Sequence, residues 1–236
     1  MYRLNRSSSL ARLALIMAAA AILCGSVLLV LNLGDGRGLA PDGCSLGLDR
    51  LIRNISSFGG KSTISGTGEA KKLLENPNFG ASPKAVGDLE AGVVDPRLVS
   101  TLLAVTKEHR ICVDTFKEGH YFLPGVPDGP LIPASYGDAG GLPNTHCYGR
   151  AADIRKVDGK PVRGNGTDPD ILSVGEIIAG IPPQERPDQI IGPQSWTEAL
   201  GRSRREGWIL DADQLRLHEN HLHIGYISDD VTLNTR

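Results

Sequence analysis

The chain has 236 residues, enough for one ordinary domain with appended segments. Its formal net charge is −2, and only 5% of its residues are aromatic. So balanced a charge implies no basic face, and so few aromatic rings offer no stacking platform for single-stranded nucleic acid. The composition therefore argues against a nucleic-acid partner.

The first element predicted along the chain is a transmembrane helix at residues 13–34. No charged residue interrupts these 22 positions, which span the roughly 30 Å hydrocarbon core of a bilayer at about 1.5 Å per residue. Arg3, Arg6 and Arg12 precede the run, so the positive-inside rule places residues 1–12 in the cytoplasm. We expect a single-pass protein of the cell membrane with an extracellular C-terminal domain. A cleaved signal peptide is the alternative, although its apolar region usually has only about 7–15 residues.

Residues 35–67 are rich in glycine and serine and are predicted to form an extracellular stalk, with room for one short helix near residues 46–55. Such a stalk either gives the domain reach into the cell wall or is a simple spacer. The remaining segment, residues 68–236, is predicted to be the functional domain. No internal repeat or second domain is evident in it.

Three cysteines follow the predicted membrane span, namely Cys44, Cys112 and Cys147. In an oxidising exterior this odd number is most simply divided into one disulfide and one free thiol. We predict the pair Cys112–Cys147, because the two residues flank the long loop described below. In an extended segment the side chain of Cys147 points away from that of His146, so we interpret Cys147 as a structural cysteine and not as a metal ligand.

Asp95-Pro96 predicts the start of a helix, with aspartate as the N-cap and proline in the first turn. The apolar stripe that follows predicts that the helix ends near His109, which we expect to cap it. Alternating β-branched residues then predict a strand at residues 110–116. Residues 117–145 contain eleven glycines and prolines, which exclude a long helix or a central strand. This loop is either a substrate lid or a surface loop that does not contact substrate.

Apolar periodicity and turn residues predict the elements that follow this loop. Helices mixed with antiparallel strands indicate an α+β fold, with a small antiparallel sheet that carries the site and flanking helices. The elements are a hairpin turn at 157–160, a helix over 171–178 that stops at Gly180, a strand at 189–191, a helix at 197–205 with Trp196 and Leu200 packed inward, and a strand at 217–224.

Two histidine-containing segments provide the ligands for a zinc site. Zinc prefers imidazole nitrogen and carboxylate oxygen, and a catalytic site uses three such ligands and a water. Residues i and i+2 of a strand point to the same face, so His221 and His223 can both approach one ion. Gly149 allows a tight bend after His146 that returns the carboxylate of Asp153 to the metal. The alternative is that the two histidines of the strand are an ordinary hydrogen-bonded pair in the core.

The segment Asn144-Thr145-His146-Cys147-Tyr148-Gly149-Arg150-Ala151-Ala152-Asp153, followed by His221-Leu222-His223, resembles the motifs SxHxxGxAxD and HxH. These motifs are typical of the zinc D-alanyl-D-alanine carboxypeptidase superfamily, which includes the lysostaphin-type endopeptidases and the hedgehog signalling domain. Only Asn144 departs from the pattern, which usually has serine there. Residues 76–226 as a whole are similar to actinobacterial cell-envelope proteins of this kind.

The resemblance implies a hedgehog-like or D-Ala-D-Ala-peptidase-like fold in which His146, Asp153 and His223 bind zinc. It also implies that His221 is a catalytic histidine that stabilises the oxyanion and that Glu219, the best match to the family's acidic residue, is the general base. His218 is expected to be a surface residue.

The residues at Lys117 and His120 fall where related enzymes begin a polar substrate-binding segment, but the usual arginine is absent, so no binding role is assigned to them. We expect a zinc metallopeptidase that hydrolyses peptide bonds in peptidoglycan stem peptides or cross-links. The alternative is a non-catalytic zinc module that binds wall peptide or a protein partner, as in the hedgehog branch.

Overall fold

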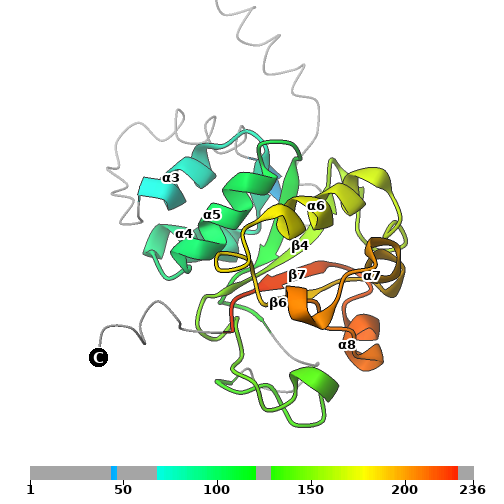
Figure 1. Cartoon of the computed structure of the whole chain (residues 1–236). Coiled ribbons are helices and arrows are strands. Elements are labelled where there is room, and N and C mark those ends of the chain that lie inside the picture. The colour runs from blue at the N-terminus through cyan, green and yellow to red at the C-terminus, as the bar shows by residue number, and fades with distance from the viewer. Residues whose placement is uncertain (1–43, 47–67, 121–128, 228–236) are drawn as a thin grey trace, which may run out of the picture. The chain divides into compact units, whose positions relative to one another are not determined.

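The computed structural model describes residues 44–46, 68–120 and 129–227 (Figure 1). They belong to one compact unit, Asp42–Arg236. The predicted membrane span at residues 13–34 lies outside the described part of the chain. Among the described helices, none is long and apolar enough to cross a bilayer.

A mixed β-sheet forms the centre of this unit, in the order β1-β2-β3-β4-β7-β6, with β5 paired to β4. The predicted α+β class is confirmed. Neighbouring strands are antiparallel, as predicted, except that β2 and β3 are parallel. Within the described residues the strands are β1 (Ser45–Leu46), β2 (Phe79–Ala81), β3 (Ile111–Thr115), β4 (Ala151–Val157), β5 (Lys160–Pro161), β6 (Gln189–Ile191) and β7 (Leu222–Gly225).

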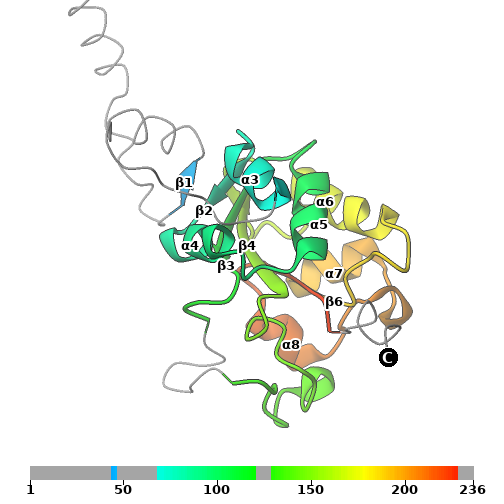
Figure 2. The same cartoon turned by 90° about the vertical axis from the view of Figure 1, so that its left-hand side faces the viewer.

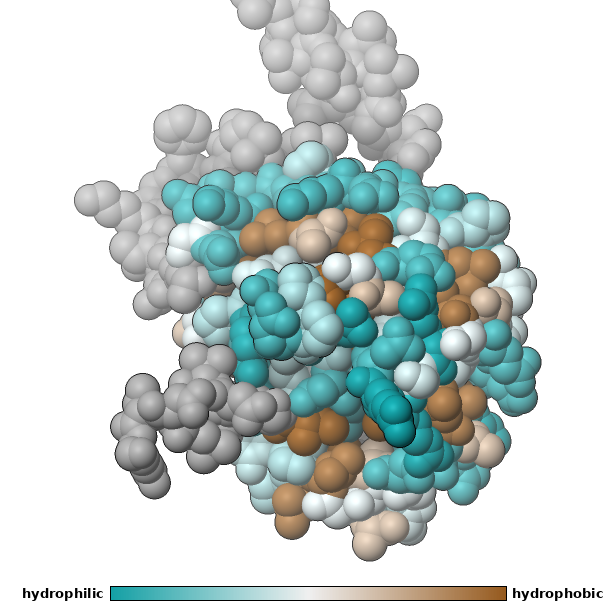
Figure 3. Space-filling model, viewed as in Figure 1, coloured by the Kyte–Doolittle hydropathy of each residue, from teal (hydrophilic) through white to brown (hydrophobic). Residues whose placement is uncertain are grey.

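Helices α3, α5 and α6 lie along one side of the sheet, whereas α8 and the loop at residues 129–149 lie on the other (Figures 1 and 2). The apolar side chains buried between the sheet and these helices include Leu98, Leu102, Ile154 and Leu222. On the face shown in Figure 3, hydrophobic residues form separate patches in a mainly hydrophilic surface. The helices are α3 (Gly68–Glu75), α4 (Pro83–Ala91), α5 (Pro96–Val105), α6 (Pro169–Gly180), α7 (Gln194–Leu200) and α8 (Ala212–Leu217), with short 3₁₀ turns at Gly137–Ala139 and Arg204–Glu206.

The helix predicted at Asp95-Pro96 is α5, and the strand predicted after it is β3. The Oδ1 atom of Asp95 accepts a hydrogen bond from the backbone N–H of Arg97 at 2.8 Å, as an N-cap does. The backbone N–H of His109 bonds to the carbonyl oxygen of Val105, the last residue of α5, at 3.0 Å, but its side chain does not cap the helix. Its Nδ1 lies 2.7 Å from Asp158 Oδ2 and its Nε2 lies 2.8 Å from Ser173 Oγ, so it links the end of the β4–β5 turn to α6.

The C-terminal third differs from the prediction in two places. Helix α7 begins three residues earlier than expected and ends at Leu200, with Gly201 as its C-cap at a φ of 58°. The strand predicted at residues 217–224 is confined to Leu222–Gly225, because a helix, α8, comes first. The carboxylate of Asp211 caps α8 by accepting from the backbone N–H groups of the second and third residues after it. The histidines at 218 and 221 therefore lie in a turn and not in an extended strand.

The disulfide joins Cys44 to Cys112, with Cα atoms 6.1 Å apart, and Cys147 is free. The predicted Cys112–Cys147 pair is therefore wrong. The reason is strand pairing over a long sequence distance: β1 is antiparallel to β2, which is beside β3, and this order brings Cys44 next to Cys112. Residues 44–46, expected within the stalk, belong to the edge of the sheet.

We predict that Cys44→Ser destabilises the domain by roughly 2–4 kcal/mol, because the bridge closes a long loop and restricts the unfolded chain. Denaturant unfolding under non-reducing conditions measures the difference. The matched control is Cys147→Ser, which removes a free thiol and should leave the free energy of unfolding nearly unchanged. Mass mapping that finds Cys112 bonded to Cys147 would contradict the assignment.

Candidate metal centre

A cavity of about 690 Å³ opens on the side of the sheet away from α3, α5 and α6. Its floor comes from β3, β4, β6 and β7, and its walls come from the loop before β4 and from the end of α8. The described part of the loop predicted at residues 117–145 thus borders the cavity. The polar and charged residues that line it include Asp114, His120, Thr145, His146, Asp153, Arg155, Gln189, His218, His221 and His223.

Three polar atoms converge on the cavity floor. His146 Nε2 lies 3.2 Å from Asp153 Oδ1 and 3.1 Å from His223 Nδ1, and the last two atoms are 3.2 Å apart. A tetrahedral zinc ion with ligand distances of about 2.0–2.1 Å separates its ligand atoms by about 3.3 Å. The triangle therefore has the size of three ligands of one metal ion, and these are the three residues that the motifs predicted.

Strand pairing and one glycine bring these residues together. Asp153 on β4 is paired directly with His223 on β7. The chain turns back after His146 through Gly149, whose φ is 69° and whose N–H bonds to the carbonyl oxygen of His146 at 2.9 Å. A Cβ on Gly149 would lie 2.0 Å from the carbonyl oxygen of Val93, so no side chain fits there. The tight bend predicted at this glycine is therefore present and required.

The outer nitrogen of each histidine faces an acceptor. His146 Nδ1 donates to the backbone oxygen of Phe116 at 2.6 Å, and His223 Nε2 donates to Gln189 Oε1 at 3.0 Å. The same amide oxygen accepts from the hydroxyl of Thr145 at 2.5 Å. Because a carbonyl oxygen only accepts, the outer nitrogen of each ring carries a proton, and in the neutral form of each ring the inner nitrogen presents its lone pair.

In this arrangement the inner nitrogens of both rings face the carboxylate, so three electron-rich atoms meet whenever the two rings are neutral. Burial lowers the pKa of His223 to about 4, so its ring is neutral. Burial alone would raise the pKa of Asp153, but the interactions with His146 and His221 hold that pKa well below its usual value, so the carboxylate is ionised. Lone pairs facing one another in a buried site repel unless a cation lies among them. The residues present thus fit a metal ion.

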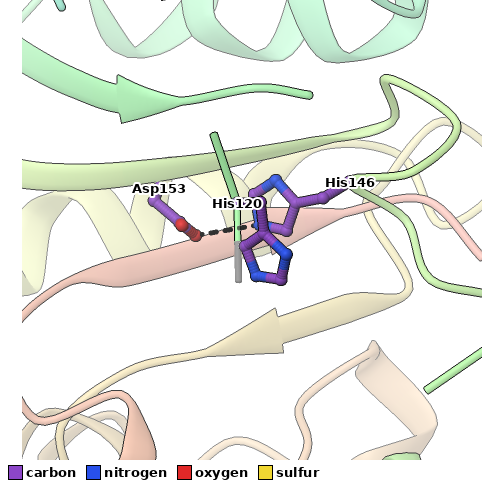
Figure 4. A group of neighbouring side chains, drawn as sticks. All are labelled: His120, His146 and Asp153. Carbon is purple, nitrogen blue, oxygen red and sulfur yellow. Dashed lines mark hydrogen bonds and ion pairs between the residues drawn. The ribbon is translucent and has the colours of Figure 1, made fainter. Parts of the chain in front are cut away.

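His120 is a further group near this triangle that sequence reasoning left without a role. Its ring stacks on that of His146, with centroids 4.0 Å apart and planes inclined by 14° (Figure 4). One of its nitrogens lies within 4.8 Å of the ligand atoms of His146 and Asp153. His120 is therefore close enough to be considered as an additional ligand.

His221, the predicted catalytic histidine, lines the cavity beside the triangle. Its Nδ1 donates to Asn220 Oδ1 at 2.6 Å, so its Nε2 carries the lone pair and lies 3.5 Å from Asp153 Oδ1. Burial lowers the pKa of His221 to about 3. The ring is therefore a neutral base at the edge of the metal position.

His218, expected at the surface, instead lines the same cavity. Its ring centroid lies 4.8 Å from that of His221 and 5.5 Å from that of His223. Its Nδ1 donates to the backbone oxygen of Gln214 at 2.6 Å, and burial lowers its pKa to about 3. The prediction was wrong because it assumed an extended strand, whereas His218 follows helix α8 and its side chain turns inward.

Glu219, the predicted general base, lies outside the cavity. Its side chain is exposed, and its Oε1 accepts from the backbone N–H of Gln194 at 3.2 Å. A general base must come within about 3 Å of the proton that it takes, directly or through one water. The position of Glu219 therefore does not support that role.

Asn144, the one departure from the motif, bonds through its side chain to the backbone on both sides of it. Its Oδ1 accepts from the backbone N–H of His146 at 3.1 Å, and its Nδ2 donates to the carbonyl oxygen of Gly129 at 2.7 Å. The substitution thus fixes the start of the turn that carries His146.

A second group of candidate ligands, His109, Asp158 and Asp170, lies away from this cavity. Asp158 accepts from His109 and from the backbone N–H of Arg110, and Lys160 Nζ lies 2.9 Å from Asp170 Oδ2. These groups neutralise and bond one another, and we interpret the cluster as structural.

Comparisons of the chain with protein-family models, curated proteins and solved structures find no match. Membership of the zinc carboxypeptidase superfamily therefore stays a prediction that rests on the two motifs.

We predict that Gln189→Leu lowers the affinity for the metal by about 10–100-fold, because it removes the acceptor that orients His223. Competition with a chromophoric chelator measures the affinity, and circular dichroism checks the fold. The exposed Gln194 lies outside the cavity, so Gln194→Leu is the matched control and should leave the affinity unchanged. Equal affinities of the two variants would show that the amide of Gln189 does not support the site.

Proposed function

We propose that this protein is a zinc metallopeptidase that hydrolyses peptide bonds in peptidoglycan stem peptides or cross-links, of the D,D-carboxypeptidase or endopeptidase type. One observation carries the proposal: the ligand atoms of His146, Asp153 and His223 converge at the floor of an open cavity, beside two further neutral histidines. The substrate class comes from the resemblance of the two motifs to those of the zinc D-alanyl-D-alanine carboxypeptidases.

The donor set favours zinc as the metal. Two imidazoles and one carboxylate are the ligands of several catalytic zinc sites, and they leave a fourth position open. A bound zinc ion would supply a polarised water whose pKa falls to about 7. The cavity gives a peptide access to that position.

The chain's own residues would handle the proton. In both His218 and His221 the proton of the neutral ring is on Nδ1, which donates to an oxygen. Nε2 of each ring is therefore unprotonated. We assign to this pair the uptake of the proton from the nucleophile and its return to the leaving amine. When protonated, His221 also offers a donor to the developing oxyanion. Glu219 has no part in this scheme.

The proposed setting is the outer face of the cell membrane, with an uncleaved anchor at residues 13–34 and peptidoglycan as the partner. The Cys44–Cys112 disulfide supports an exterior location, because disulfides persist mainly in oxidising compartments.

The alternative function is a non-catalytic zinc module that binds wall peptide or a protein. The proximity of His120 favours it, since a fourth protein ligand would close the site, as in structural zinc centres. Replacing this residue separates the two functions. A closed site should lose much of its zinc affinity in His120→Ala, whereas an open site should keep it.

We expect the purified, zinc-loaded chain to release fragments of defined mass from muropeptides, and removal of zinc with a chelator to abolish the release. Mass spectrometry of the digest also shows which bond is cleaved. If the zinc-loaded chain leaves all muropeptides intact while still binding them, the non-catalytic alternative is correct.

We predict that His223→Ala loses zinc, whereas His221→Ala keeps zinc and loses about 10²–10⁴ in rate, because only the former supplies a ligand. Metal analysis and muropeptide turnover distinguish the two effects. Glu219→Gln should change neither, since its side chain lies outside the cavity. Unchanged zinc content and folding in both histidine variants would instead support an ordinary hydrogen-bonded pair.

A further inference from the structure

Two charged side chains beside the metal position lie at irregularities of the sheet. The ladder between β3 and β4 is interrupted twice, and the residues left without a partner in it are Asp114 on β3 and Arg155 on β4. Alternation along each strand places both side chains on the cavity face, because Arg155 follows Asp153 by two residues and Asp114 comes next to the core residue Val113. Both of these residues line the cavity that contains the metal position.

Arg155 is placed to bind an anion at the cavity mouth. Among the described lining residues it is the one arginine or lysine, and its side chain is 50% exposed. Asp114 Oδ2 lies 2.9 Å from Arg155 Nε, on one edge of the guanidinium group. A guanidinium has five N–H donors in a flat fork, so the donors on the terminal nitrogens remain for a second carboxylate.

The position of Arg155 along the strand fixes how far that second carboxylate lies from the metal position. Arg155 is two residues after Asp153 on β4, a step of about 7 Å. A peptide with one carbonyl oxygen at the metal position would therefore bring the next residue of its backbone near Arg155. The pair with Asp114 does not block this contact, because it engages only Nε of the half-exposed guanidinium group.

We propose that Arg155 binds the terminal carboxylate of the substrate, one residue beyond the scissile bond, and so selects peptides with a free C-terminus. This inference rests on the proposed peptidase function and deepens it, because it assigns the carboxypeptidase mode. Asp114 is a positioning residue that holds Nε of the guanidinium. The charge balance agrees, since a divalent ion and Arg155 together outweigh the two carboxylates of the cavity and attract an anion.

Binding, measured without turnover, tests the proposal. The ligands are peptides that end in D-alanyl-D-alanine with the scissile amide reduced to a methylene-amine, prepared as the free acid and as the C-terminal amide. Calorimetric titration of the zinc-loaded full chain should show the free acid binding about 10–100-fold more tightly than the amide, as expected for a bidentate contact between charged groups.

Substitutions of two arginines distinguish a direct contact with Arg155 from a nonspecific effect of the protein's positive charge. Arg155→Ala should abolish the preference for the free acid with zinc content unchanged, and Arg155→Lys should retain only part of it. Arg163 is exposed and does not line the cavity, so Arg163→Ala is the matched control and should keep the preference. A preference that survives in Arg155→Ala, or wild-type protein that binds acid and amide equally, overturns the inference.

A second source of carboxylate is the side chain of an acidic residue within the stem peptide. Peptides in which only this internal carboxyl group is amidated distinguish the two sources. The terminal assignment is wrong if amidation of the internal carboxyl group weakens binding to the wild-type protein and not to Arg155→Ala, while amidation of the C-terminus has no effect. Failure of the proposed function looks different: the free acid is preferred through Arg155, yet no muropeptide is cleaved.

Discussion

The pairing of β4 with β7 sets Asp153 opposite His223, and the rest of the site depends on this register. A slip of β7 by one residue would turn His223 to the other face of the sheet, among the helices, and away from Asp153. The core prevents this shift, because the neighbours Ile154, Leu222 and Ile224 are fully buried on that face. Burial of apolar side chains on one face thus determines which polar side chains meet on the other.

The next constraint is the ring of acceptors behind the histidines. The carbonyl oxygen of Phe116 and the amide of Gln189 determine which nitrogen of each ring is protonated, so the lone pairs of the inner nitrogens face a carboxylate. Gly225 leaves room for these contacts, because a Cβ there would lie only 3.0 Å from both His223 Nε2 and Thr145 Oγ1. Without a metal ion, the lone pairs and the carboxylate of such a site repel one another. Metal binding should therefore also contribute to the stability of the fold.

Local rules explain what the sequence could predict. The cap at Asp95, the alternation at Ile111–Thr115 and the bend at Gly149 each depend on neighbouring residues alone, whereas His221 lines the cavity from a turn and not from the strand that its spacing predicted. Three features were not predicted. His218 was missed because Asp211 caps a helix where an extended strand was expected. Gln189 was missed because its role depends on pairing with β7, and Cys44 because its partner is 68 positions away. The latter two depend on strand order, which no local pattern reveals.

Whether the site is open or closed depends on the orientation of His120. The lone pair of an imidazole nitrogen lies in the plane of its ring, so the metal position lies close to the ring plane of His146. The ring of His120 is stacked above that plane, with centroids 4.0 Å apart and an inclination of only 14° (Figure 4). Its own lone pairs therefore run nearly parallel to the plane that contains the metal position and do not point toward it. In this orientation His120 covers one side of His146 and leaves a fourth position open, which supports the proposed catalytic function over its alternative.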